Sequence, residues 1–213
     1  MSNWLSLEEL RFDGNLVHFP TPLWDQIPLP ALRVIASYPV DRDGAGQQAD
    51  RLLPRLIKSS KDTLQSLAFN SCRLDPNLRS IILSSPLPRL VKLIIHDLDL
   101  KVACYIDDIL AHLPQLETLS CSPSSLKDVT CLLALSHLRH LELGECDDNF
   151  FDSLGAILSQ LRLSTIRCRA MSEDYTSRRH FKQIAREAKV ELIPETAEVE
   201  WRRQQRAHPG RRT

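Results

Sequence analysis

The chain has 213 residues, enough for one domain with a sizeable hydrophobic core. Lys plus Arg and Asp plus Glu number 27 each, so the formal net charge is zero, which argues against broad electrostatic capture of nucleic acid. The N-terminus lacks the charged start and apolar run of a signal peptide, and no stretch approaches the ~18 apolar residues of a membrane span. We therefore expect no membrane partner and a cytoplasmic location, with the nucleus as a second option.

In chain order, the first feature is a recurring pattern of an apolar residue, two others, an apolar residue, one other and an apolar residue. It predicts short strands whose apolar side chains alternate toward one face. The fullest copy continues through Cys72 and Leu74, and the weakest has Ser37 at its third apolar position. An eighth strand is predicted from Val190. The seven copies are separated by steps of 25, 32, 26, 26, 22 and 25 residues and begin at Leu7, Leu32, Leu64, Leu90, Leu116, Leu138 and Leu163.

The segments between these strands predict helices or helical turns that cover one side of the sheet. Apolar residues follow helical spacing from Ala49 to Ile57, where Pro54 predicts a late start or a kink. Asp75 and Pro76 are a capping residue and a first-turn proline, a typical helix start. Three further apolar stripes predict helices within residues 106–113, 150–161 and 181–188.

The domain prediction is a repeat domain over residues 1–195, with seven to eight repeats, and an Arg-rich tail over residues 196–213. Residues 41–48 are a polar insertion that explains the longest step. The tail has little apolar content, so we expect it to be disordered. Its arginines leave open a role in nuclear import or in binding an acidic partner.

The six cysteines are predicted to be reduced and buried. Four of them, Cys72, Cys121, Cys146 and Cys168, fall on apolar positions of the repeat, and Cys104 and Cys131 fall between strands. A free thiol packs as a small apolar group, as expected inside a cell.

Catalytic and metal-binding motifs are absent from the sequence, so we expect no enzyme activity, cofactor or metal. No phosphate-binding glycine loop, C-x-x-C, H-E-x-x-H or G-x-S-x-G pattern occurs. His137 and His140 straddle a strand entry, where alternation would not direct both at one ion. The acidic pairs at 107–108 and 147–148 fall at predicted helix starts, where capping accounts for them.

The candidate binding surface consists of the side chains between the apolar anchors, on the open face of the sheet. Val34, Ala36, Tyr38, Ala68 and Ile94 form an apolar patch in its N-terminal half, and the C-terminal half is charged. An apolar centre beside charged groups suits a protein partner, and tyrosine is enriched among residues that dominate binding. An ordinary solvent-facing sheet, with Glu142 and Arg167 paired across neighbouring strands, is an equal alternative. The predicted contact residues are Val34, Tyr38, Lys92, Ile94, His96, His140, Glu142, Arg167 and Arg169.

The spacing and the cysteine in the ninth place of the repeat resemble leucine-rich repeats of the ribonuclease-inhibitor-like kind, and the irregular steps resemble the repeat region of fungal F-box proteins. The resemblance covers about residues 5–195. It implies an α/β leucine-rich-repeat solenoid, or horseshoe, with short parallel strands on the concave face and helices or turns on the convex face. In F-box proteins such repeats hold a substrate while an F-box docks on the Skp1–cullin ubiquitin ligase, and no F-box is recognisable before Leu7.

We therefore expect a non-catalytic module that binds a protein partner through the concave sheet, as the substrate-recognition part of a ubiquitin-ligase receptor. Two alternatives remain open: a structural or degenerate repeat fragment without a dedicated ligand, and binding of nucleic acid or an acidic partner through the Arg-rich tail. Trp4 and Leu5 are apolar where a terminal repeat normally carries a polar cap, so self-association at an uncapped N-terminal edge is a further hypothesis.

Overall fold

The computed structural model describes residues 7–13, 31–38, 46–70, 76–84, 86–96, 105–169 and 176–194. Within them, eight strands form one sheet in sequence order, and every neighbouring pair is parallel. This confirms the predicted α/β class, the parallel strands and the eighth strand. The strands are β1 (Glu9–Asp13), β2 (Val34–Tyr38), β3 (Ser66–Asn70), β4 (Lys92–His96), β5 (Thr118–Cys121), β6 (His140–Glu145), β7 (Thr165–Arg169) and β8 (Glu191–Pro194).

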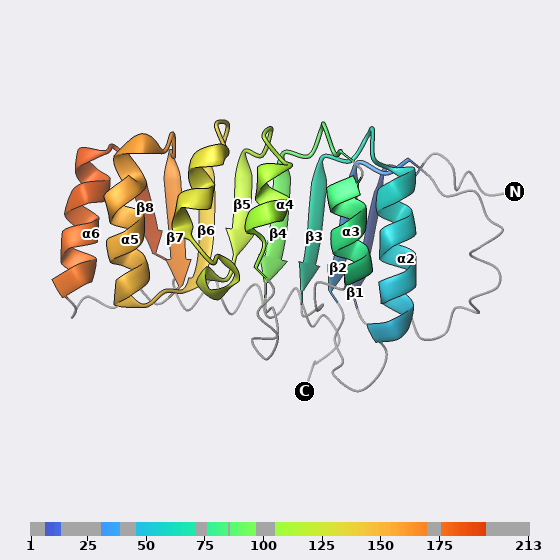
Figure 1. The fold of residues 1–213 in the computed structure, drawn as a ribbon, viewed down its shortest axis with the longest axis horizontal. Helices are drawn as coiled ribbons and strands as arrows, with labels where there is room; N and C mark the ends of the chain where they lie inside the picture. The colour runs from blue at the N-terminus through green and yellow to red at the C-terminus, as the bar shows by residue number, and fades with distance from the viewer. Residues whose placement is uncertain are drawn as a thin grey trace, which may run out of the picture.

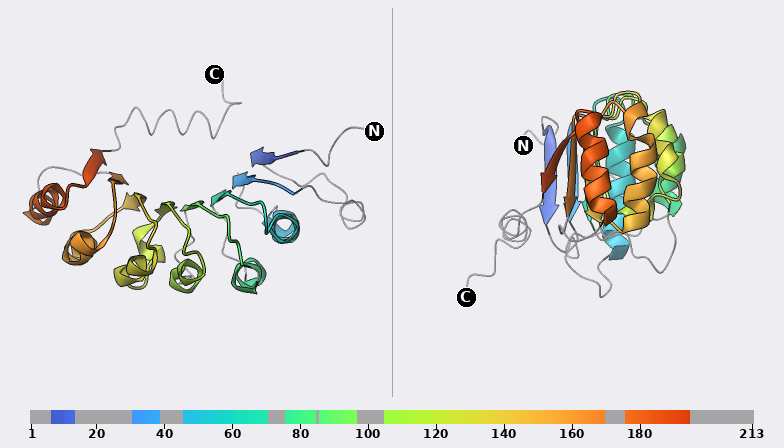
Figure 2. Two further views of the ribbon diagram at one scale, coloured as in Figure 1. Left: turned by 90° about the horizontal axis from the view of Figure 1, so that it is seen from above. Right: turned by 90° about the vertical axis from the view of Figure 1, so that its left-hand side faces the viewer.

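Helices connect the strands and lie on one side of the sheet (Figure 1). Seen from above, the sheet is curved, with the strands along the inner side of the arc and the helices along the outer side (Figure 2, left). Parallel neighbours need such crossover connections, and among the described residues no helix lies on the inner face of the sheet. The described helices are α2 (Gly46–Ser59), α3 (Pro76–Ser84), α4 (Asp107–Ala111), α5 (Asp148–Ile157) and α6 (Thr176–Glu187), with 3₁₀ turns η3 (Pro123–Ser125), η4 (Val129–Ala134) and η5 (Leu158–Gln160).

The core lies between the sheet and the helices, and the repeated apolar positions build it. Strand alternation directs one set of side chains to this layer. Leu67 and Phe69 of β3 are fully buried there, and the equivalent residues of the following strands stack beside them. The predicted helical stripes supply the other side. Among them are Leu56, Ile57, Ile109, Leu110, Phe151, Leu154 and Phe181.

A hydrogen-bond pattern repeats at the entries to β2 through β7 and keeps these repeats in register. The carbonyl of Glu8 accepts the backbone N–H groups of Arg33, at 2.7 Å, and Val34, at 3.2 Å. Since the same two-donor arrangement links successive strands from β1 to β7, these strands begin level with one another, and at β8 the Ser164 carbonyl accepts the N–H of Glu191. The two-donor arrangement recurs at the carbonyls of Arg33, Gln65, Val91, Glu117 and Arg139.

Of the two alternatives predicted for the second segment, the late start is wrong, because α2 begins at Gly46 and continues through Pro54, and the kink at Pro54 stays a prediction. Proline removes one helical hydrogen bond, to the carbonyl of residue 50, but its buried ring lies on the apolar side of the helix. Packing of Leu53, Leu56 and Ile57 into the core offsets that loss. The proline at the start of α3 is confirmed as the first helical residue, and Asp75 lies outside the described residues.

The two acidic pairs have different roles. Asp147 is the N-cap of α5, and its carboxylate accepts the N–H of Phe150 at 2.8 Å, which confirms capping. Asp107 does not cap α4, since it accepts the N–H groups of Lys127 and Asp128 from the following connection at 3.1 Å each. It therefore fixes the position of the next repeat.

The two ends of the sheet differ. In β1, the edge strand of the described sheet, Leu10 is only partly buried and so is Leu7 beside it, whereas the equivalent Leu32 and Ile35 are fully buried. At the other end, α6 packs on α5, with the rings of Phe151 and Phe181 centred 5.0 Å apart. The proposed N-terminal edge residues Trp4 and Leu5 lie outside the described residues.

Candidate protein-binding surface

The candidate surface is the sheet face opposite the helices, and strand pairing arranges its side chains in rows. The first row runs Glu9, Val34, Ser66, Lys92, Thr118, His140, Thr165 and Glu191. The second runs Arg11, Ala36, Ala68, Ile94, Ser120, Glu142, Arg167 and Ile193. Both rows agree with the register expected from the repeat pattern over their first seven members.

The apolar patch is smaller than predicted. Val34 and Ile94 are half-buried and can contact a partner, but Ala36 and Ala68 are each only 3% exposed. A methyl side chain in the middle of a parallel sheet lies below its longer neighbours, so these alanines do not serve as contact surface. Ser120, next along the same row, is fully buried.

The charged half of the surface is held together by cross-strand contacts. Arg167 donates a hydrogen bond to the carboxylate of Glu142 at 3.1 Å, and both side chains are partly exposed, at 33% and 26%. His140 Nδ1 lies 2.9 Å from the hydroxyl of Thr165. His140, Glu142 and Arg167 therefore lie on adjacent strands of the same face, and the Glu142–Arg167 pairing is the contact expected of an ordinary solvent-facing sheet. Thr165 was missed as a site residue, although its place opposite His140 across the sheet was the signal that could have found it.

Four predicted contact residues remain: Lys92, Tyr38, His96 and Arg169. Lys92 is exposed in the first row, two strands from His140. Tyr38, His96 and Arg169 are the last residues of their strands, and their side chains lie outside the described part.

A bulge in β6 changes the register beyond the two rows, at the C-terminal ends of β6 and β7. The sequence places Gly144 beside Arg169, but the register shifts after Leu143, and Glu145 lies opposite Arg169 instead. An extra residue in one strand displaces the following side chains by one position. The bulge therefore makes Glu145, and not Gly144, the register partner of Arg169.

Of the four described cysteines, Cys121, Cys146 and Cys168 are buried as predicted, whereas Cys131 is only partly buried. Burial raises the pKa of Cys121 and of Cys131 from 9.0 to about 12. The pKa of Cys146 is also raised, first by its hydrogen bond with Cys168 and then by burial. Because the thiolate is the nucleophile and the metal ligand, these environments favour packing over chemistry. Cys121, Cys131, Cys146 and Cys168 are all free thiols, and Cys72 and Cys104 lie outside the described residues.

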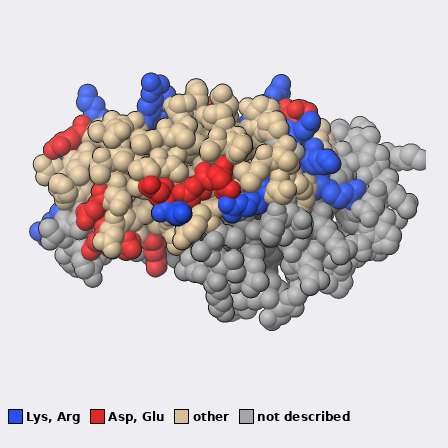
Figure 3. Space-filling model, viewed as in Figure 1, with Lys and Arg blue, Asp and Glu red and all other residues tan. Residues whose placement is uncertain are grey.

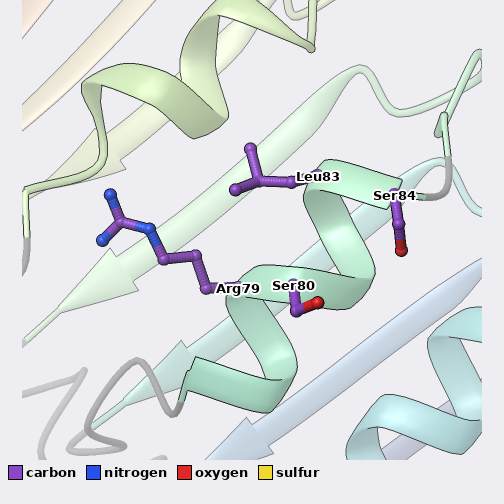
Figure 4. A pocket seen from close by; sticks show the side chains of 4 residues that line it. All are labelled: Arg79, Ser80, Leu83 and Ser84. Carbon is purple, nitrogen blue, oxygen red and sulfur yellow. The ribbon is translucent and has the colours of Figure 1, made fainter.

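The helical side offers less for binding. A shallow pocket of about 410 Å³ lies along α3, lined by Arg79, Ser80, Leu83 and Ser84 (Figure 4). Its one charged group already contacts Asp108 of α4, at 2.6 Å. Acidic and basic side chains are intermixed over this face, so neither sign of charge dominates it (Figure 3).

The described ranges contain no group of three or more His, Cys, Asp or Glu side chains placed to hold a metal ion. Nor does any helix among them combine the length and apolar character needed to cross a bilayer.

Comparison with known proteins adds no relative: no family model, no curated protein and no solved structure matches the chain.

Proposed function

We propose that this chain is a leucine-rich-repeat horseshoe that binds a protein partner through its concave sheet. The observation that carries the proposal is the two-row arrangement of side chains on the open sheet face. Apolar Val34 and Ile94 lie in the N-terminal half of this face, on β2 and β4. Lys92 is also on β4, and His140 and the Glu142–Arg167 pair follow on β6 and β7. Aliphatic groups that exclude water beside charged groups that fix orientation are the usual composition of a protein interface.

The fold supports this use of the surface. The curved parallel sheet presents its side chains along one continuous inner face, and the repeated carbonyl pattern holds successive strands level. Stacked repeats commonly use such an extended concave surface for binding. The resemblance to F-box repeat regions adds the proposal that the partner is the substrate of a Skp1–cullin ubiquitin ligase.

The experiment is quantitative affinity capture from extract with a concave variant and a matched helical-side variant. The concave variant is Lys92→Glu, Ile94→Asp and His140→Glu. The control carries the same three kinds of change at residues outside the sheet, Lys127→Glu, Leu133→Asp and His112→Glu, all of which are exposed. Circular dichroism and thermal unfolding verify that both variants fold.

Loss of a defined partner set by at least tenfold in the concave variant alone supports the proposal. Skp1 and a cullin in that set support the ligase role, and their absence counts against it. Equal capture by the native chain and both variants would overturn binding through the concave face.

A further inference from the structure

A second charged surface lies on α6, separate from the concave sheet. Arg179, Lys182 and Arg186 occupy positions i, i+3 and i+7 of this helix, so they fall within an arc of about 60° around its axis. Arg179 and Arg186 are exposed and Lys182 is half-buried. We call these three residues the α6 basic face.

The packing of α6 shows where the basic face points. Phe181 of α6 contacts Phe151 of α5. The side chain of Ile184, also on α6, lies next to Gly155 of α5. The basic face is about 160° around the helix from these two residues, on the flank away from α5. No described helix lies beyond α6, and this end of the molecule faces the viewer in Figure 2, right.

Other charges on the helix do not interrupt this face. Glu187 accepts a hydrogen bond from Gln183 at 3.0 Å, and both lie toward the opposite edge of the exposed surface. Lys189, just past the helix end, is also exposed and extends the positive charge along the same end of the domain. A polar flank on a terminal repeat prevents further stacking, but polarity of either sign would serve that purpose.

We propose that the α6 basic face is a docking site for an acidic segment of a protein partner. Two guanidinium groups and an ammonium group within two helical turns match a run of carboxylates, which arginine can bind through paired hydrogen bonds.

The geometry favours this partner over other anions. The α6 basic face spans about 10 Å along the helix axis, so it can contact only a few phosphates. Because nucleic-acid affinity grows with the number of phosphates neutralised, a face of this length suits nucleic acid poorly. The chain as a whole has a formal net charge of zero. Membrane binding by a helix requires an apolar face to enter the lipid, and that face of α6 is already buried through Phe181 and Ala185.

The test measures binding of a fluorescein-labelled peptide of ten glutamates to the full chain by anisotropy at low salt. The test variant is Arg179→Glu, Lys182→Glu and Arg186→Glu. The control makes the same change in net charge at exposed positions elsewhere, Lys61→Glu, Arg89→Glu and Lys127→Glu. Urea unfolding confirms that each variant is folded.

The expected result is a loss of peptide affinity of at least tenfold in the α6 variant, a change below threefold in the control, and weaker binding as salt is added. Equal losses in both variants would show a response to net charge alone and overturn the site. Absence of peptide binding by the native chain at millimolar concentration would also overturn it. Tighter binding of a 20-base-pair duplex or of phosphatidylserine vesicles, lost in the same variant, would reject the acidic-protein assignment.

Discussion

Arg167 donates a hydrogen bond of 3.1 Å to Glu142 between the adjacent strands β6 and β7, on the open face of the sheet. The two residues occupy the same row and are directly opposite in the register. Because both side chains remain partly exposed, the pair can stabilise the sheet and still offer charge to a partner.

The first prediction concerns how strongly this pair contributes to stability. A double-mutant cycle with Glu142→Gln and Arg167→Gln should give a coupling of about 0.2–1 kcal/mol in urea unfolding, as for other solvent-screened pairs. Glu8 and Arg33, a longer and more exposed pair at 3.4 Å, should give a smaller coupling and serve as the control. A coupling above about 2 kcal/mol for Glu142 and Arg167 would mark the pair as structural and argue against its use in binding.

The second prediction concerns a buried hydroxyl group. Ser60 is fully buried, and its Oγ accepts the backbone N–H of Leu32 at 2.9 Å, which ties the end of α2 to the entry of β2. Ser60→Ala leaves that N–H without its partner inside the core and should lower the free energy of unfolding by about 1–3 kcal/mol. The neighbouring exposed Ser59→Ala is the control and should change it by less than about 0.5 kcal/mol. Equal effects of the two substitutions would contradict this role for Ser60.

The repeat pattern was enough to predict the strands and the register of the first two rows, and the resemblance to leucine-rich repeats implied their parallel order. Side-chain alternation and recurring spacing are local properties, and the same local choice is made in every repeat. The pairing of Glu142 with Arg167 followed from that register. The cysteine positions were predictable for the same reason, since Cys121 and Cys168 stand where other repeats have Leu, Phe or Ile.

Features that depend on neighbouring repeats were not predictable from the pattern. The bulge after Leu143 brings Glu145 opposite Arg169, and nothing in the repeat spacing reveals an inserted residue. Exposure of Ala36 and Ala68 was overestimated because it depends on the size of the side chains around them. The sequence predicts capping for Asp107 from its place at a helix start. Its actual hydrogen-bond donors belong to residues about twenty positions later, and the local pattern does not reveal them. The continuation of α2 through Pro54 depends on core packing that outweighs local preference.

The third prediction concerns the end of α6. Lys189 has φ of 59°, and the N–H groups of Lys189 and Val190 bond to the carbonyls of Arg186 and Ala185, as in a Schellman motif. Glycine adopts this backbone conformation without the steric cost that a side chain adds. Lys189→Gly should therefore raise the free energy of unfolding by about 0.5–1 kcal/mol relative to Lys189→Ala, which removes the same charge but keeps the strain. An alanine variant as stable as the glycine variant would show that the backbone is unstrained there.

The fourth prediction concerns the alkaline limit of stability. Burial raises the pKa of Cys121 to about 12 from its ordinary value of 9.0. The folded state therefore holds the protonated thiol, and its contribution to stability is complete below pH 9. That contribution is lost as the pH rises from 9 toward 12, because only the unfolded chain releases the proton in that interval.

Between pH 8 and 10.5, the Cys121 thiol should lower the free energy of unfolding by roughly 2 kcal/mol, since each pKa unit corresponds to about 1.4 kcal/mol. Cys121→Ala is less stable at neutral pH because the smaller side chain leaves a cavity in the core. Between pH 8 and 10.5, however, its free energy of unfolding should fall by roughly 2 kcal/mol less than that of the native chain. Urea midpoints at the two pH values measure the difference, and exposed Lys and Tyr residues cancel because both chains contain them. Parallel declines in the two proteins would show that the Cys121 thiol ionises as readily in the folded chain as in the unfolded one.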